Sequence, residues 1–540
     1  MADPKQPTPP TPIGVANSSS ATVVEYVSPA HNDTATDVEG GRGGRLFKLF
    51  RWRIAVPAYS FIIYLIAVAL AICLLVFLSS SQGFVLAEII GVPSDQLGDS
   101  AGSLSFYDQL MSLPSVYLWG VASDRIGRRT VYSLGFFTMA IALASYTFAK
   151  NLYPQLLIIR LIFAVGGAAS SSMVTAVLAD YAGEQDRGKI AGVVGIVSGL
   201  GALLALFVFL PLPARFGDDD PVKGLRVTYL VVAGLAVVVA GLAFLGLQRR
   251  RNVKVWESTA GVGRSSASGQ EGLVAGADED GAVVTGPVPK RSFWALAREG
   301  IAEAKDPKIL LGYSACFLAR GDTIIITTFV PLWVYKYYID SGLCPITDPD
   351  DPDKKTLCHD AYITSSMLTG IAQTLTIVGA PLFGYLSDRL YRPLTLLIST
   401  VLGLLSYLWL FLSPSPIQKQ VYFPILLLGL AEIGAVVTSL SLVTASTIPK
   451  DARGSVAGVS SFVGALGILI NTKVGGVLFD GWRSTGPFFV MVVAHAVVTV
   501  IAIWVVFVEV GRERARRRRE GGHGSRGVLE ELRRQQLEVR

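Results

Sequence analysis

The sequence predicts an all-α integral membrane protein with twelve transmembrane helices, arranged as two parallel six-helix repeats. Three observations support this fold class. The 540-residue chain is 51% hydrophobic and only 16% charged, whereas soluble domains carry about 25% charged residues. Twelve segments are long and apolar enough to cross a hydrocarbon core, which needs about 20 apolar residues. Two short sequence patterns also recur at equivalent places in the two halves of the chain.

The predicted spans follow from a scan for apolar stretches. In the first half they cover 57–80, 102–122, 130–149, 155–179, 190–213 and 227–247. In the second half they cover 309–335, 362–386, 394–412, 421–445, 455–478 and 487–508. The first span is too long and too far from the N-terminus for a signal peptide, and the second span is the least apolar.

Polar segments divide the chain into five regions. A Pro-, Ser- and Thr-rich tail is expected to be disordered, and a Gly-, Ser- and acid-rich stretch is expected to connect two bundles. Within that connector, one amphipathic surface helix is predicted over 292–305. The regions are the tail 1–50, the first six-helix bundle 51–247, the connector 248–307, the second six-helix bundle 308–510 and a basic tail 511–540.

The positive charge points to a lipid bilayer and not to nucleic acid. The net charge is +6, and much of the basic excess lies beside apolar segments, as at 42–53, 249–251 and 514–519. Such runs face an anionic cytoplasmic leaflet. Both tails, the connector and the loops after the second, fourth, eighth and tenth spans are basic, whereas 348–355 is acidic. We therefore expect a multi-pass protein with both termini in the cytoplasm, and we favour the plasma membrane over an organelle.

The two repeated patterns define a parallel repeat. The pattern G-x-x-S-D-R occurs at 120–125 and again 264 residues later at 384–389. The pattern R-G-x-x-A-G-V occurs at 187–193 and again 266 residues later at 453–459. Because six spans lie in each half, both halves cross the membrane in the same sense.

The segment GVASDRIGRR at 120–129 resembles the signature of the major facilitator superfamily between the second and third helices. The twelve spans, the long connector and the half-length repeat follow the same pattern over about 450 residues. The resemblance implies the major facilitator fold and a transporter that works by alternating access. It also implies that helices 1, 4, 7 and 10 line a central cavity.

Within this segment, the resemblance implies a gating network near the cytoplasmic face. Gly120 would allow close approach to a neighbouring helix, and Asp124 and Arg128 are four residues apart. In the family, the acid and the arginine form a charge network with an acid at the end of helix 4, a position that Asp180 matches. Arg125 either joins this network or acts only as a cytoplasmic anchor.

The second copy of the signature is incomplete. Asp388 and Arg389 are retained, but no glycine follows, and Ser446 or Thr447 stands where an acid would match Asp180. We expect a network that is strong in the first half and vestigial in the second.

Charged residues inside predicted spans are candidates for function, because a charge at the bilayer centre costs about 2.5–3.5 kcal/mol. Arg320 and Asp322 lie near the middle of the seventh span, and Glu432 lies at similar depth in the tenth. Residues two apart on a helix do not face each other, so we expect Arg320 or Asp322 to pair with Glu432. These residues either contact substrate and protons or only pair structurally.

A second group lies in the first half, where Asp108 and Arg160 lie at similar distances from the outer surface of the membrane. They form a plausible buried pair, with either a structural or a proton-coupling role. Lys473 and His495 are weaker candidates, since a lone histidine usually serves packing.

The cysteines and missing motifs exclude other functions. Cys344 and Cys358 share the outer loop after the seventh span, where we expect a disulfide. The sequence has no metal-ligand cluster, no phosphate-binding glycine loop and no catalytic triad, so we expect neither a cofactor, a bound metal nor an enzyme.

We therefore expect a secondary active transporter that moves a small organic solute, is coupled to protons and acts as a monomer. The alternative is a transporter-like membrane sensor that binds solute without moving it. Asp322 and Glu432 are the proton-carrying candidates, and Arg320 is the candidate for holding an anionic or polar substrate group.

Overall fold

The computed structural model describes residues 57–181, 187–216, 221–248, 293–344, 358–443, 453–508 and 511–512. Within these ranges the regular structure is helical and contains no strand. The predicted N-terminal tail, most of the connector and nearly all of the C-terminal tail lie outside the described residues. The all-α prediction is confirmed for the described part of the chain.

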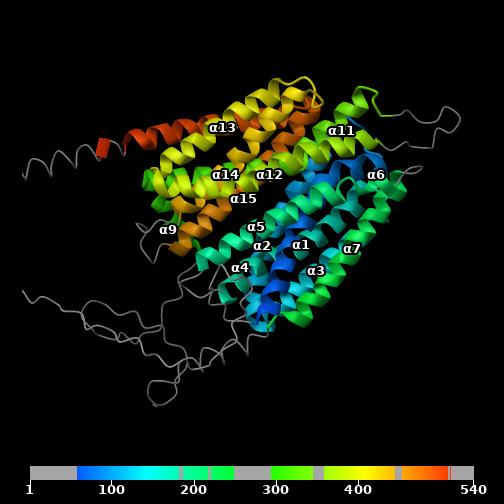
Figure 1. Cartoon of the computed structure of the whole chain (residues 1–540), viewed down its shortest axis with the longest axis horizontal. Helices are drawn as coiled ribbons and strands as arrows, with labels where there is room; N and C mark the ends of the chain where they lie inside the picture. Colours follow the sequence, from blue (N-terminus) through cyan, green and yellow to red (C-terminus); the bar gives the residue numbers. More distant parts are fainter. Residues whose placement is uncertain are drawn as a thin grey trace, which may run out of the picture. The chain divides into compact units, whose positions relative to one another are not determined.

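The helices of the first half pack mainly against one another. They are α1 (Ala58–Phe84) with its π-helical extension η1 (Val85–Ile90), α2 (Leu97–Ile126), α3 (Arg128–Tyr146), η2 (Leu152–Leu156) leading into α4 (Leu157–Tyr181), α5 (Arg187–Leu204) continued by η3 (Ala205–Phe209) and α6 (Leu212–Phe216), and α7 (Pro221–Gly246). Helix α3 packs on α4 and α7, α1 packs on α5, and α2 packs on α4 (Figure 1).

The second half repeats this arrangement. After α9 (Phe293–Ala302) and η4 (Glu303–Lys305), it contains α10 (Pro307–Ile324), η5 (Ile325–Phe329), α11 (Val330–Asp340), α12 (His359–Arg389), α13 (Arg392–Leu412), η6 (Lys419–Val421), α14 (Tyr422–Val443), α15 (Arg453–Gly481) and a last helix (Gly486–Val508). Helix α10 packs on α15, as α1 packs on α5 in the first half. Helix α14 packs on both α12 and α13, as α4 packs on α2 and α3. Helix α9 lies within the predicted amphipathic segment and packs on α15.

Ten of the described helical segments are long and apolar enough to cross a membrane. Helices α2 and α3 are 30 and 19 residues long, and both pack against α4. Their polar and charged ends lower their average hydropathy, so the count of twelve spans stays a prediction for these two helices.

The helices extend beyond the predicted apolar segments. The first predicted span ends at residue 80, but α1 and η1 continue to Ile90. The polar run at 81–82 stays helical because it finds partners on other helices: the Ser81 and Tyr229 hydroxyls lie 2.8 Å apart, and Gln82 donates to the Ala101 carbonyl. Apolar content locates a span, whereas packing decides where its helix ends.

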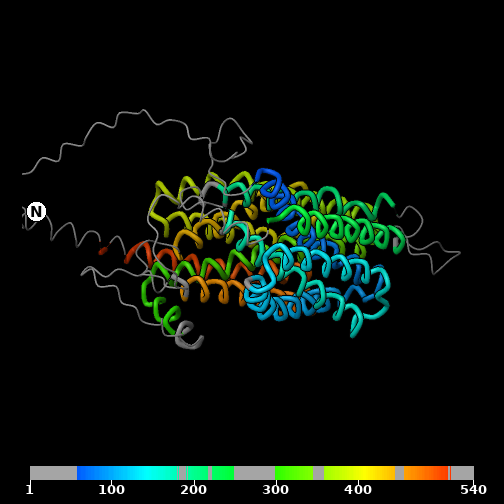
Figure 2. Tube along the Cα trace, turned by 90° about the horizontal axis from the view of Figure 1, so that it is seen from below, coloured from blue at the N-terminus to red at the C-terminus, as the bar shows by residue number. Residues whose placement is uncertain are grey.

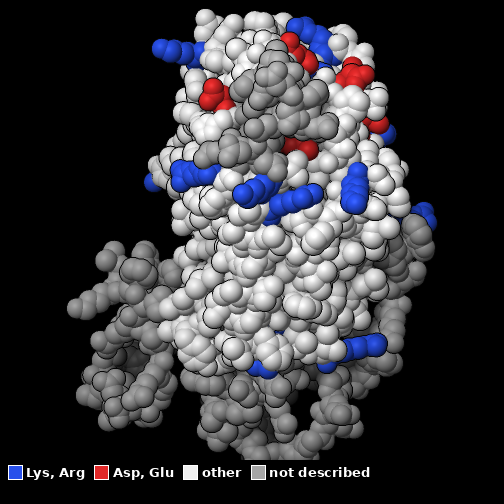
Figure 3. All heavy atoms as spheres, turned by 90° about the vertical axis from the view of Figure 1, so that its right-hand side faces the viewer, with Lys and Arg blue, Asp and Glu red and all other residues white. Residues whose placement is uncertain are grey.

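The surface supports placement in a membrane. On the face drawn in Figure 3, a broad band without Lys, Arg, Asp or Glu separates charged side chains toward the top from basic side chains near the bottom. Such a band matches the hydrocarbon core of a bilayer.

The helices run in roughly the same direction in both halves (Figure 2). We call the end that carries Cys344 and Cys358 the disulfide end, and the end that carries the segments 120–129 and 384–392 the motif end. Contacts between the halves form mainly between α2 and α15 and between α5 and α12.

At the disulfide end these four helices approach each other closely. A Cβ added to Gly102 of α2 would lie 2.1 Å from the Thr472 carbonyl oxygen of α15. A Cβ on Gly370 of α12 would lie 2.3 Å from the Phe207 ring. Side chains larger than hydrogen would therefore force the halves apart at this end.

At the motif end the same helices are separated. A Cβ added to one glycine of each helix would meet no heavy atom within 4 Å in the described structure; these glycines are Gly120 of α2, Gly192 of α5, Gly384 of α12 and Gly458 of α15. The two halves are thus closed at the disulfide end and open at the motif end.

Candidate functional site

Arg320 is an exposed residue of α10. It follows the first residue of that helix by 13 positions, about 20 Å along the axis. Its side chain is exposed, and its Cγ would lie 3.0 Å from a Cβ on Gly464 of α15. Among the described residues its guanidinium has no hydrogen-bond or ion-pair partner. An unpaired cation at this depth can hold an anionic group.

Asp322 points away from Arg320, because two residues on a helix are about 200° apart. Its carboxylate is fully buried and accepts from the Tyr407 hydroxyl at 2.7 Å. The Nε2 atom of His495 lies 3.0 Å from the same oxygen. Asp322 thus faces α13 and the last helix, and its predicted place in the substrate and proton cavity stays a prediction.

Glu432 is held by neutral donors. Its carboxyl is 4% exposed and accepts from Thr323 at 2.8 Å, from Thr376 at 3.0 Å and from Gln373 at 3.2 Å. The predicted partnership with Arg320 or Asp322 is wrong, since the directions of the α10 side chains place Thr323 against Glu432 instead. A buried carboxyl with neutral donors can bind and release a proton.

Asp108 and Arg160 form an ion pair inside the first half. The Nε and Nη2 atoms of Arg160 both donate to one oxygen of Asp108, the former at 2.8 Å. The remaining Nη1 atom donates to the Gln82 side-chain oxygen at 2.8 Å. Gln82 was missed because it follows the predicted end of the first span. This network ties α1, α2 and α4 together.

The gating residues at the motif end are partly assembled. The Nε atom of Arg128 lies 2.7 Å from an Asp180 oxygen, and Nη1 donates to the Ala176 carbonyl. Gly120 does not approach a neighbouring helix, contrary to expectation, because the halves are separated at this end. The side chain of Asp124 lies outside the described residues, and Arg125 is exposed.

The second copy keeps part of this arrangement. Arg392, which the sequence analysis did not select, donates to the Ser441 carbonyl of α14 at 3.0 Å, as Arg128 does to α4. Asp388 is exposed, and the Arg389 guanidinium lies 5.3 Å from the centre of the Tyr385 ring. Ser446 and Thr447 lie outside the described residues.

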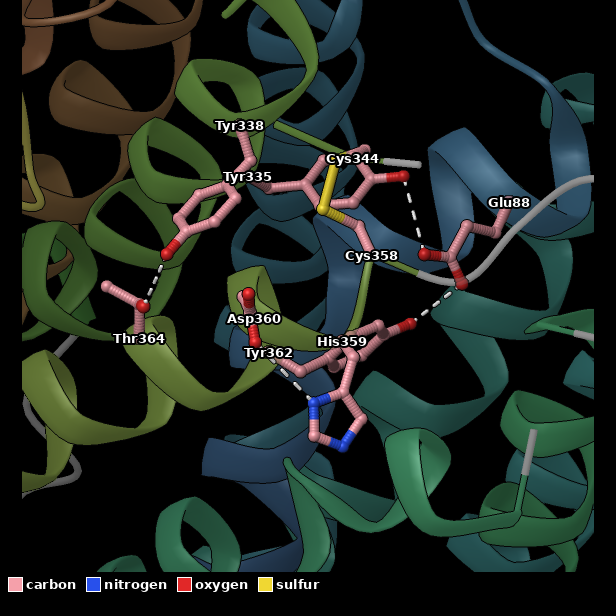
Figure 4. The surroundings of a disulfide bond; sticks show 9 residues. All are labelled: Glu88, Tyr335, Tyr338, Cys344, Cys358, His359, Asp360, Tyr362 and Thr364. Atoms are coloured by element: carbon pink, nitrogen blue, oxygen red, sulfur yellow. Dashed lines mark hydrogen bonds and ion pairs between the residues drawn. A yellow bond between two sulfur atoms is a disulfide. The ribbon is translucent and has the colours of Figure 1, made fainter. Parts of the chain in front are cut away.

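The disulfide end contains a carboxyl group that the sequence analysis also missed. Glu88 of η1 is 7% exposed and accepts from Tyr362 of α12 at 2.8 Å and from Tyr335 of α11 at 3.4 Å (Figure 4). The Phe84 ring stacks on the Tyr362 ring, with centroids 3.7 Å apart. Cys344 and Cys358 form a disulfide beside this cluster. Glu88 therefore links the first half to two helices of the second.

A further link joins α2 to α15. Both carboxylate oxygens of Asp480 accept from the backbone at the start of α2, from Gly98 at 2.9 Å and Asp99 at 2.6 Å. A carboxylate at this position satisfies free amide groups of the helix N-terminus. Lys473 pairs with Asp99 at 2.7 Å, but both side chains are about half exposed, so this ion pair contributes at most about 1 kcal/mol.

The family follows from comparison with known proteins. The family model for the Major Facilitator Superfamily matches residues 60–347 and 356–537, which is most of the chain. The chain belongs to the Major Facilitator Superfamily. The predicted family and fold class are confirmed.

Several curated proteins resemble the chain in sequence. Magnetosome protein MamZ of Paramagnetospirillum magneticum is 23% identical over 435 residues, covering 79% of this chain and 60% of that protein. Magnetosome protein MamH of the same organism is 22% identical over 448 residues, covering 82% and 91%. Citrate exporter 1 of Aspergillus niger is 35% identical over 83 residues, 15% of this chain and 16% of the exporter. The chain thus spans less than two thirds of the length of MamZ.

Two solved structures share the superfamily fold. The nucleoside transporter NupG matches with a TM-score of 0.56 and 14% identity, covering 82% of this chain and 99% of NupG. A bacterial homologue of the human lysosomal transporter Spinster, inward-facing and unoccupied, matches with a TM-score of 0.54 and 15% identity, covering 83% and 95%.

Proposed function

We propose that this superfamily member is a secondary active transporter that moves a small organic solute by alternating access. The observation that carries the proposal is the asymmetry of the contacts between the halves, which are closed at the disulfide end and separated at the motif end. A reversal of this asymmetry would expose a site near the middle of the helices to the opposite side. The membership in a family of transporters supports the same function.

The proposed orientation places the motif end and both termini in the cytoplasm of a cell, with the protein a monomer in the plasma membrane. The basic loops at the motif end support this orientation. In this orientation the structure is open to the cytoplasm. Closure at the motif end would bring the segment at 120–129 against the second half, with Arg128 and Asp180 holding its base.

The proposed substrate carries an anionic group that contacts Arg320. This residue is an exposed cation near mid-depth, with no partner among the described side chains. An arginine at such a site offers several donors to a carboxylate or phosphate. Proton coupling would use the buried carboxyl groups, of which Glu432 lies beside Thr323, three residues from Arg320.

Uptake into proteoliposomes tests this function. The purified protein would be assayed with labelled citrate and labelled uridine, with and without an imposed pH gradient. We expect saturable, gradient-stimulated uptake of the anionic solute, and Arg320→Ala to lower its affinity at least tenfold, because a charge-assisted contact contributes about 1.5–3 kcal/mol.

The matched control is Arg298→Ala, which removes an exposed arginine from α9, outside the helices that line the opening. This variant should transport like the wild type. Saturable binding without uptake or exchange would overturn the transporter proposal and favour a sensor. Equal uptake by Arg320→Ala and wild type would remove Arg320 from the substrate site.

A further inference from the structure

The cluster behind α10 has an unusual arrangement of acceptors around one histidine. His495 of the last helix is fully buried, and its Nε2 atom lies 3.0 Å from Asp322 Oδ1. Its other ring nitrogen, Nδ1, lies 3.3 Å from the Thr400 carbonyl oxygen of α13. A carbonyl oxygen only accepts hydrogen bonds, and so does an ionised carboxylate.

Both nitrogens of the ring therefore face acceptors. With Asp322 ionised, a neutral imidazole, which carries one N–H, would in either tautomer present a ring-nitrogen lone pair to an oxygen lone pair. An imidazolium carries a hydrogen on each nitrogen and satisfies both contacts. Because Asp322 Oδ1 also accepts from Tyr407 at 2.7 Å, two donors converge on that oxygen, as expected for a carboxylate.

The packing holds this arrangement in place. A Cβ on Gly403 of α13 would lie 2.2 Å from the imidazole Cε1 atom, so the ring lies directly against the α13 backbone. Among the described residues, the groups facing the pair are Tyr407 and the Thr400 carbonyl from α13, and Asn471 of α15, which lies against Gly321. From α14, Glu432 contacts the adjacent Thr323 and not the pair itself.

Loss of the proton would leave a net negative charge in a site without solvent exposure. Asp322 and His495 are both 0% exposed, and the second Asp322 oxygen has no hydrogen-bond partner among the described residues. An isolated charge in such a site is costly, so this conformation stabilises the protonated pair.

The pair also lies where α10 can change shape. The π-helical η5 begins at Ile325, three residues after Asp322. Such segments often mark functional bends in a helix. Arg320 lies on the same turn as Asp322 and on the opposite face, so a movement of α10 at this point would displace the guanidinium.

We propose that Asp322 and His495 together form the binding site for a coupling proton, held as an imidazolium–carboxylate pair while the disulfide end is closed. Loss of the proton favours opening of that end, and the pair affects substrate binding through α10 without contacting substrate. This inference rests on the proposed transport function and assigns a role to His495, which the sequence made only a weak candidate.

The first test measures the protonation of His495 directly. The full-length protein in lipid would be labelled with 15N in the histidine rings, and His495→Gln would assign the signal among the four histidines. At pH 7 we expect both nitrogens of His495 to be protonated. In Asp322→Asn the ring should be neutral, because the buried imidazolium would lose its counter-charge. A neutral ring in the wild type overturns the proposal.

The second test measures the conformation with protons as the only ligand. Spin labels at Lys150 and Leu343, which are exposed in loops of the two halves at the disulfide end, report its opening in a Cys316→Ser background. Because the closed form holds the proton, its population should fall as pH rises.

In Asp322→Asn and in His495→Gln, this pH dependence should disappear. An unchanged pH dependence in both variants would overturn the proposal. This measurement and the transport assay can fail independently. A conformation that depends on pH through this pair, in a protein that shows no uptake, would contradict the proposed function only. Normal proton-driven uptake by both variants would contradict this inference only.

Discussion

At the scale of single residues, the largest difference between sequence and structure is the direction of side chains. Depth along a helix follows from counting residues, so Arg320, Asp322 and Glu432 could be placed near the middle of their helices. Rotation could not be predicted, because it depends on which helix packs on each face. Asp322 consequently lies in a buried cluster with His495, and Glu432 contacts Thr323.

Glu88 was missed for a different reason. The first predicted span ended at residue 80, where apolar composition ends, and residues after it were treated as loop. In the structure the helix continues through η1 and places Glu88 between the halves. The available signal was an acid within the apolar stretch FVLAEII at 84–90, which a scan for average hydropathy does not weigh.

The hydrogen bonds of Glu88 predict an effect on closure. Tyr362→Phe removes one hydrogen bond between the halves while retaining the ring that stacks on Phe84. We expect the closed population to fall about fivefold, since one such bond contributes about 1 kcal/mol. The spin-label distance between positions 150 and 343 measures this change.

Tyr338→Phe is the matched control. The Tyr338 hydroxyl lies 2.9 Å from Thr364, so this hydrogen bond stays within the second half. Its removal should leave the distance distribution unchanged. An equal shift in both variants would mean that Glu88 does not hold the halves together.

At the scale of helices, the sequence predicted the positions of the elements well because apolar segments and polar loops alternate clearly. The repeated patterns also predicted which helices correspond, and the pairings of α1 with α5 and α10 with α15 agree with that correspondence. Helix ends were less predictable, since polar residues at 81–82 remain helical when other helices supply their partners.

Close contact between α2 and α15 predicts sensitivity at Gly102. Gly102→Leu would place a side chain where the Thr472 carbonyl oxygen lies 2.1 Å from the Cβ position. Overpacking costs about 1–3 kcal/mol, so the closed population should fall between about fivefold and 150-fold. The same spin-label pair measures the shift.

Gly241→Leu on α7 provides the comparison, because a Cβ there meets no heavy atom within 4 Å in the described structure. The spin-label distances of this variant should match those of the wild type. Closure that is insensitive to leucine at Gly102 would show that α2 and α15 separate without resistance from this contact.

At the scale of the whole molecule, the sequence could not predict which end is closed. Glycines occur toward both ends of the four helices at the interface. Gly102 and Gly370 each lie against the opposite half, whereas Gly120 and Gly384 do not in the described structure. Only the arrangement of the halves distinguishes these two pairs of glycines. The sequence describes helices that can approach each other at either end.

Transport against a gradient is a property of the whole molecule, and the position of Glu432 allows it to be tested. Glu432→Gln removes a group that can carry a proton while retaining acceptor capacity toward Thr323 and Thr376. We expect accumulation driven by a pH gradient to fall to the level of passive equilibration, whereas exchange of labelled for unlabelled solute continues. Initial uptake and counterflow rates in proteoliposomes separate the two activities.

Gln373→Leu is the companion variant, since it removes one donor to Glu432 and keeps the carboxyl group. It should retain accumulation. If Glu432→Gln also accumulates solute at the wild-type rate, Glu432 carries no coupling proton.

The glycine contacts have a mechanical consequence. Helix α12 is continuous from His359 to Arg389, touches the first half at Gly370 and stands clear of it at Gly384, about 21 Å further along its axis. If α12 pivots between these two positions, closing the gap at Gly384 separates the contact at Gly370. A transporter whose halves move in this way would not open both ends at once, so it would move solute without forming a continuous pore.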